Sequence, residues 1–197
     1  MSWTEMNIAG ALARQFFNRQ HLVVVPNCIW TGHESDLLVV CNDLRLIDVE
    51  IKISRADFKA DAKKDKWWSR KFMGYGEPQE VFHHGHLIGK NRPSVYETTQ
   101  RSWPPKVWKH YYCMPKEIYS EDLLEFIGSK SSGVLLLSEQ ERGAPIVITC
   151  AKRCIPNRDA AKITAAQAID IARLASLRMW TAFDTVAAMQ KKARAAA

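Results

Sequence analysis

Residues 44–54 constrain the fold of this chain more than any other segment. Two kinds of side chain alternate there: apolar Ile47, Val49, Ile51 and Ile53, and charged Asp48, Glu50 and Lys52. Because successive side chains of a β-strand point to opposite faces, this pattern predicts a strand with one apolar and one charged face. The apolar face belongs in a core. Two acids and a lysine in line on the other face are unusual for a strand otherwise suited to burial.

The surrounding pattern predicts an α/β protein with a mixed central sheet flanked by helices, in one domain over residues 1–197. Apolar and β-branched runs, turn signals and helical spacing divide the chain in order. The first predicted elements are a helix over 4–18, strands over 21–30, 35–41 and 44–54, and a helix over 55–66. They are followed by a strand over 106–114, a short helix over 120–127, strands over 133–138 and 145–150, and a helix over 162–189.

Residues 67–105 lack periodicity and contain glycines, prolines and aromatic residues. A long irregular segment inside a compact domain is usually functional, so we expect an insertion beside the active cleft that contributes to substrate choice. Its aromatic residues, interspersed with basic ones, could stack on nucleic-acid bases or form a small core of the insertion itself. The motif His83-His84-x-His86 does not favour zinc, because no fourth ligand is near in the sequence.

Charge is distributed unevenly along the chain, whose net charge is +7. Residues 1–54 hold four basic and six acidic side chains, whereas residues 55–110 hold twelve basic and six acidic ones. This contrast suits an enzyme that binds a metal with carboxylates and a polyanion with lysine and arginine, although a solvated basic surface is the alternative. Lys59, Lys63, Lys66 and Arg70 follow helical spacing and predict a basic ridge, either solvated or in contact with a DNA backbone.

The chain has no apolar run long enough to span a membrane and no secretory signal at its start. Its five cysteines have no paired spacing, so a disulfide framework is not expected. We therefore expect a cytoplasmic protein with no membrane partner. The sequence does not indicate an oligomeric state.

Asp36 is a lone acid at the start of an apolar strand, and burying such a charge is costly unless it is paired or binds a metal. Glu50 and Lys52 would lie ~6–7 Å apart on one face, which lets a carboxylate bind a hard cation beside an ammonium group. A site built only of carboxylates suits Mg²⁺ or Mn²⁺. The alternative to a metal site is that these charged residues form the solvent-exposed face of an amphipathic hairpin with a cross-strand ion pair.

For Asp36 and Glu50 to share a metal, both must point to the same face of the hairpin. We therefore predict that Asp36 faces Glu50 or Asp48, which requires a connection of odd length, or a bulge, around residues 42–43. A two-residue turn would instead pair Asp36 with Val49 and separate the carboxylates.

Asp36, followed by Glu50-Ile51-Lys52 on the next strand and then by a helix, resembles the PD-(D/E)XK nuclease superfamily. The amino-acid sequence over residues 34–40 and 49–58, with Asp61, is similar to that of MmcB-like DNA-repair nucleases of bacteria and phages. The resemblance implies a restriction-endonuclease-like αβββαβ core. One departure is Ser35, which stands where proline is usual.

The resemblance also implies roles for individual residues. Asp36 and Glu50 would bind Mg²⁺ or Mn²⁺ with the carbonyl of Ile51, and Lys52 would orient the attacking water. Glu5 is a further catalytic candidate from the first helix, with helix capping as its alternative role. Glu34 and Asp48 would support the site or lie on the surface.

These observations favour a Mg²⁺-dependent deoxyribonuclease in DNA processing or repair, with DNA as its partner. Two alternatives remain. One is a non-catalytic nucleic-acid-binding module on the same fold, and the other is an unrelated α/β interaction protein.

Overall fold

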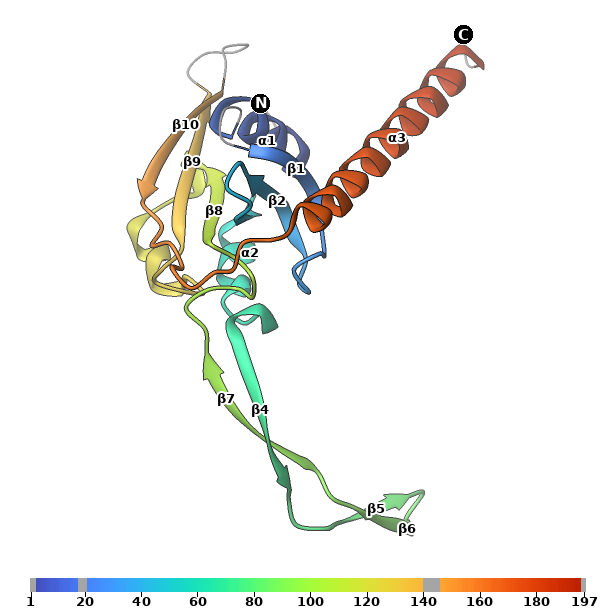
Figure 1. Ribbon diagram of the computed structural model, residues 1–197. Coiled ribbons are helices and arrows are strands. Elements are labelled where there is room, and N and C mark those ends of the chain that lie inside the picture. The colour runs from blue at the N-terminus through green and yellow to red at the C-terminus, as the bar shows by residue number, and fades with distance from the viewer. Residues whose placement is uncertain (1–2, 18–20, 140–145, 196–197) are drawn as a thin grey trace.

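A mixed six-stranded sheet forms the centre of the protein (Figure 1). The computed structural model describes residues 3–17, 21–139 and 146–195. The strands in spatial order are β1 (His21–Cys28), β2 (Ser35–Cys41), β3 (Leu46–Ile51), β8 (Lys109–Pro115), β9 (Gly133–Glu139) and β10 (Ile146–Lys152). Strands β3, β8 and β9 are mutually parallel, and the other neighbours are antiparallel. The predicted α/β class with a mixed sheet is confirmed.

The helices are shorter or longer than the sequence pattern predicts. They are α1 (Glu5–Ala11), continued by a π-helical turn η1 (Leu12–Phe16), α2 (Arg55–Asp61), the 3₁₀ turns η2 (Asp65–Trp67), η3 (Lys116–Ile118) and η4 (Glu121–Phe126), and α3 (Ala165–Ala195). The predicted helix over 55–66 was too long, because α2 ends at Asp61. Residues 18 and 145, at the bounds of two predicted elements, lie outside the described residues.

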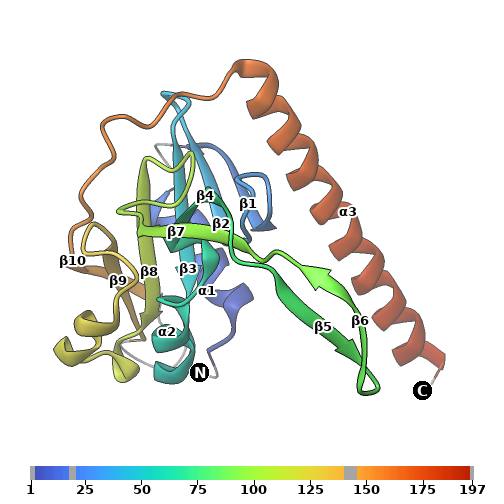
Figure 2. The ribbon, with the colours of Figure 1, turned by 90° about the horizontal axis from the view of Figure 1, so that it is seen from below.

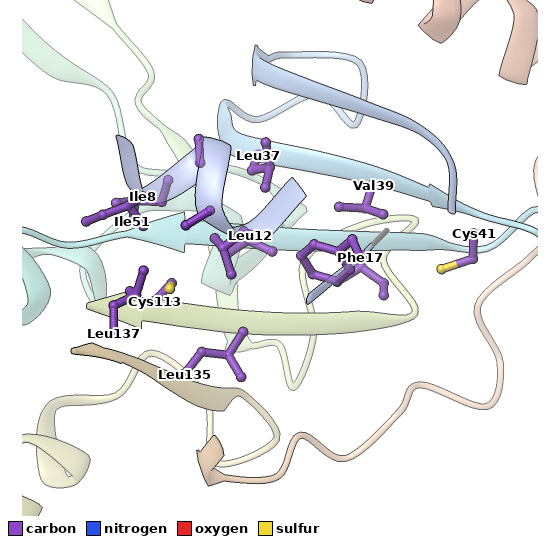
Figure 3. Close-up of a cluster of buried hydrophobic side chains, with 14 residues drawn as sticks. Ile8, Leu12, Phe17, Leu37, Val39, Cys41, Ile51, Cys113, Leu135 and Leu137 are labelled. Carbon is purple, nitrogen blue, oxygen red and sulfur yellow. The ribbon is translucent and has the colours of Figure 1, made fainter. Parts of the chain in front are cut away.

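One face of the sheet is covered by α1 and η1 (Figure 3). Ile8 and Leu12 are fully buried there against apolar side chains of β2, β3, β8 and β9. The predicted apolar face of β3 is part of this core, through Ile47, Val49 and Ile51. The charged residues of β3 must therefore point to the other face of the sheet.

Two separate apolar clusters cover that other face. The start of α3 packs Ala168 and Ile171 on β1 and β2. Helix α2 and the neighbouring 3₁₀ turns pack Phe58, Trp67 and Leu123 on β8 and β9. The charged side chains of β3 lie between these two clusters.

Residues 68–100 form β-structure, so the irregular segment predicted over 67–105 was wrong. Strands β4 (Trp68–Tyr75) and β7 (Ser94–Gln100) pair as an antiparallel ribbon, and β5 (Gln79–His83) and β6 (His86–Asn91) pair as a hairpin at its end. The ribbon projects from the domain, and both views place its tip well outside the sheet (Figures 1 and 2). Neither face of the ribbon is buried, so its sequence lacks the apolar–polar alternation that identifies a half-buried strand.

Helix α3 extends beyond the domain after its first turns (Figure 1). Three large apolar side chains of this helix, Ile169, Trp180 and Phe183, are exposed. Ala168 and Ile171 pack on the sheet instead. None of the helices in the described part of the chain has the length and apolarity needed to cross a membrane.

Candidate functional site

Strands β2 and β3 have the register that a shared carboxylate site requires. Leu37 pairs with Val49, so the next pair along the ladder places Asp36 opposite Glu50. The hairpin has a three-residue connection, closed by a 2.9 Å hydrogen bond from the Cys41 amide to the Arg45 carbonyl. Leu44 takes a positive φ of 64° in this turn. The prediction of an odd-length connection is confirmed, and Asp36 and Glu50 share a face.

Glu50 is fully buried and binds three lysines. Its Oε2 accepts from Lys52 and Lys64, each at 2.9 Å, and its Oε1 accepts from Lys66 at 2.6 Å. Lys52 and Lys66 are buried, whereas the side chain of Lys64 is 45% exposed. Burial alone would raise the pKa of Glu50, but the surrounding ammonium groups outweigh it and lower this pKa.

Asp61 is a second fully buried carboxylate that shares these lysines. Its Oδ1 lies 3.3 Å from Lys52 and 2.9 Å from Lys64. Its Oδ2 accepts hydrogen bonds from the Tyr112 hydroxyl at 2.6 Å and the Trp67 indole at 3.1 Å. Burial opposes ionisation, yet the lysine charges hold the pKa of Asp61 far below its ordinary value. Glu50 and Asp61 thus form one ionised cluster with their lysines.

Asp48 and His110 border this cluster on adjacent parallel strands. The Lys66 ammonium lies 3.4 Å from His110 Nε2, and His110 Nδ1 lies 2.9 Å from Ser132 Oγ. Burial, reinforced by the charge of Lys66, lowers the pKa of His110 well below its ordinary value, so the ring is neutral. Because an ammonium can only donate, Nε2 is the acceptor, and we assign the ring proton to Nδ1.

Asp36 differs from Glu50 because it forms no ion pair with any described residue. Its Oδ2 accepts a 2.7 Å hydrogen bond from the Ile51 amide. Burial and the nearby charge of Glu50 raise the pKa of Asp36 to about 6. Asp36 also lines a small cavity of about 110 Å³ together with Glu5 and Ile51. The structure therefore brings Glu5, from the start of α1, to the same cavity as two residues of the hairpin.

The donors around this cavity fit a hard divalent cation in their chemistry. Asp36, Glu5 and the Ile51 carbonyl offer only oxygen, which Mg²⁺ and Mn²⁺ prefer, and Glu50 lies opposite Asp36 on the neighbouring strand. Burial and the charge of Glu50 disfavour the ionised form of Asp36, and a bound cation would favour it. Among the described residues, no group of three or more His, Cys, Asp or Glu side chains is arranged to hold a metal by itself. Lysines occupy both carboxylate oxygens of Glu50, so a cation that binds Glu50 would have to displace one of them. Lys64 is the exposed one of the three.

Other predicted residues lie apart from the cavity. Glu34 is exposed. The three histidines 83, 84 and 86 lie on the exposed tip hairpin. The predicted basic ridge is wrong for Lys66, which turns inward on η2 to meet Glu50.

Sequence reasoning did not identify Lys64, Lys66, His110 and Tyr112 as parts of the site. One available signal was the three-residue spacing of Phe58 and Asp61, which places an acid on the buried face of α2. The lysines gave no comparable signal, because only their tertiary contact with Glu50 explains their positions.

The chain is similar in structure to a protein of unknown function from Silicibacter pomeroyi, with a TM-score of 0.50 and 14% sequence identity. The match covers 94% of this chain and 93% of the other chain. At this identity the likeness concerns the fold alone. No family model matches the sequence, and no curated protein is significantly similar to it.

Proposed function

We propose that this chain is a metal-dependent nuclease that hydrolyses phosphodiester bonds of DNA, with Asp36, Glu50 and Lys52 at its active centre. The observation that carries the proposal is the β2–β3 register, which sets Asp36 opposite Glu50. Lys52 directly follows the last residue of the same strand, and its ammonium lies 2.9 Å from Glu50. Two carboxylates therefore share one face of the hairpin with a lysine in contact with Glu50, and Asp36 lines a cavity.

The order of the elements supports a restriction-endonuclease-like core. Helix α1, the antiparallel strands β1, β2 and β3, helix α2 and strand β8 follow in the αβββαβ order, and β8 pairs parallel to β3. The ribbon of β4 and β7 lies between α2 and β8 in the chain, as an insertion into this core.

Phosphodiester hydrolysis needs a nucleophilic water and neutralisation of the charge that develops at the phosphate. Mg²⁺ or Mn²⁺, when bound, supplies a water of lowered pKa and positive charge. Asp36, Glu50 and the Ile51 carbonyl would hold the ion, and Glu5 lines the same cavity as Asp36 and Ile51. The contact between Glu50 and Lys52 keeps the ammonium at the reacting centre, where it orients the water and binds a phosphate oxygen.

The test is cleavage of single-stranded and duplex DNA by the purified chain. We expect cleavage with Mg²⁺ or Mn²⁺ that stops with EDTA and is inhibited by Ca²⁺, whose looser coordination orients water poorly. Lys52→Ala is expected to reduce the cleavage rate by orders of magnitude and to leave DNA affinity nearly unchanged. Asp36→Asn is expected to weaken Mn²⁺ binding, measured by calorimetry, as well as cleavage.

Glu34→Gln is a matched control, because Glu34 is an exposed acid two residues before Asp36. It is expected to behave as the wild type in both assays. Cleavage that survives the double variant Lys52→Ala/Asp36→Asn would contradict the proposed active centre.

A second candidate function is nucleic-acid binding without turnover. It is favoured by the three ammonium groups that occupy both oxygens of Glu50 and compete with any cation. Such a module would bind DNA in a salt-dependent manner, with no metal requirement and no cleavage. An interaction protein of unrelated function would show neither binding nor cleavage.

A further inference from the structure

One face of the ribbon carries a row of aromatic side chains that leads away from the domain. Trp68, Arg70 and Phe72 alternate along β4 and so share a face, and Tyr96 pairs with Phe72 across the ribbon. The ladder shifts register between Phe72 and Gly74, where glycine takes a φ of 131°. This bulge returns Tyr75 to the same face, because its ring contacts that of Phe72.

These rings pack on one another and are not buried by the rest of the protein. Phe72 lies 5.2 Å from Tyr75 and 5.7 Å from Tyr96 between ring centroids, in edge-to-face contacts. Phe72, Tyr75 and Tyr96 are 49%, 68% and 51% exposed. A cluster that leaves about half or more of each residue exposed to water is not a core, so one of the two roles predicted for these aromatics lacks support.

A groove of about 560 Å³ lies at the base of this face. It combines cationic, aromatic and hydroxyl side chains: Lys63, Asp65, Trp68, Arg70, Tyr96 and Thr98. Asp65 binds Arg70 at 3.0 Å and offsets one of the two cationic charges, so the groove keeps a net positive charge. The segment 63–68, which supplies Lys63, Asp65 and Trp68 to the groove, also carries Lys64 and Lys66, whose ammonium groups bind Glu50. One short segment therefore contributes side chains both to the groove and to the candidate active site.

We propose that this groove and the aromatic row bind single-stranded nucleic acid and lead it to the site around Glu50. The bases stack on Tyr96 and Phe72, and the phosphates lie against Lys63 and Arg70. Aromatic rings flanked by cations are a general means of holding an unpaired strand, because every base offers a π-face and every linkage a negative charge. A duplex offers the same phosphates but hides its base faces in the stack, so the exposed rings favour the single strand.

The purpose assigned to the groove rests on the proposed nuclease activity, but strand binding is measured separately from cleavage. The experiment follows the anisotropy of a labelled oligothymidylate with the full chain in EDTA, and repeats it with a labelled duplex. Tyr96→Ala and Phe72→Ala are each expected to weaken oligothymidylate binding about tenfold and to change duplex binding little. Arg70→Ala and Lys63→Ala are each expected to reduce the salt dependence of binding by about one phosphate contact.

The opposite face of the ribbon provides matched controls. Val95→Ala removes an exposed apolar side chain there, and Lys71→Ala removes a cation whose cross-strand partner is Glu97. Both are expected to bind oligothymidylate within about twofold of the wild type. Unchanged binding in the Tyr96 and Phe72 variants, or an equal loss for single strand and duplex, would overturn the inference. Binding that depends on the rings in a protein that cuts no DNA would overturn the proposed nuclease and leave this inference standing.

Discussion

Two regions of this protein depart from the usual distribution of residues in opposite ways. Around Glu50, charged side chains are buried between two apolar clusters. On the ribbon of β4 and β7, aromatic side chains are exposed to water. The buried charges depend on one another, because each loses its compensation when a partner is removed. The exposed rings contribute little to folding. Perturbing the first region should therefore lower the stability of the fold, whereas perturbing the second should change only what it binds.

The largest expected effect is that of Glu50→Ala on stability. This change leaves the buried ammonium groups of Lys52 and Lys66 without their nearest carboxylate. Removing one partner of a buried ion pair costs about 3–5 kcal/mol, so we expect a loss of this order in the free energy of unfolding, measured with urea. Glu97→Ala on the ribbon is the control, with an expected change of less than about 0.5 kcal/mol. Similar losses in both variants would remove the contrast between the regions.

The second expected effect is a pH dependence that comes from Asp36. Burial and the charge of Glu50 raise its pKa from 3.8 to about 6, so the folded state holds this proton more tightly than the unfolded chain. The stability that Asp36 contributes is therefore complete below about pH 4 and is lost as the pH rises through 6. Asp36→Asn removes this loss. Relative to the wild type in EDTA, the variant should gain about 1–2 kcal/mol between pH 4 and pH 7, with its partial exposure taken into account.

Val95→Ala, on the exposed ribbon, provides the comparison, because it removes no titratable group. Its stability difference from the wild type should not vary with pH over the same range. If the stability difference between Asp36→Asn and the wild type also stays constant with pH, Asp36 is solvated like a surface acid. Mn²⁺ should reverse the trend in the wild type, because a bound cation favours the ionised carboxylate.

The parts of this molecule that follow periodic burial were predictable from the sequence. Strand β3 has alternating faces that identify both its core side and its charged side. The odd connection around residues 42–44 follows from requiring Asp36 and Glu50 to meet. Helix α1 is also placed correctly by its apolar spacing, although its continuation is a π-helical turn.

The remaining features depend on tertiary contacts or on the lack of burial. Lys66 fits a helical ridge with Lys63 and Arg70, but α2 ends earlier and the 3₁₀ turn η2 directs this side chain inward. No local pattern favours burying a lysine, since the favourable free energy comes from Glu50, sixteen residues earlier. The sequence of the ribbon has no apolar–polar alternation that would identify its strands, because neither of its faces is buried.

The smallest expected effect concerns the tip hairpin of β5 and β6, where the ribbon is farthest from the domain (Figure 2). Leu87 and Ile88 are 53% and 64% exposed there, on strands whose residues are all exposed. Leu87→Ser/Ile88→Ser therefore removes almost no buried apolar area, and the melting temperature should stay within about 2 °C of the wild type. The aromatic row ends at Tyr75, before the tip, so oligothymidylate affinity should also stay within about twofold. A clear loss of affinity with an unchanged melting temperature would extend the binding surface to the tip, and a lower melting temperature would show that the exposed hairpin stabilises the fold after all.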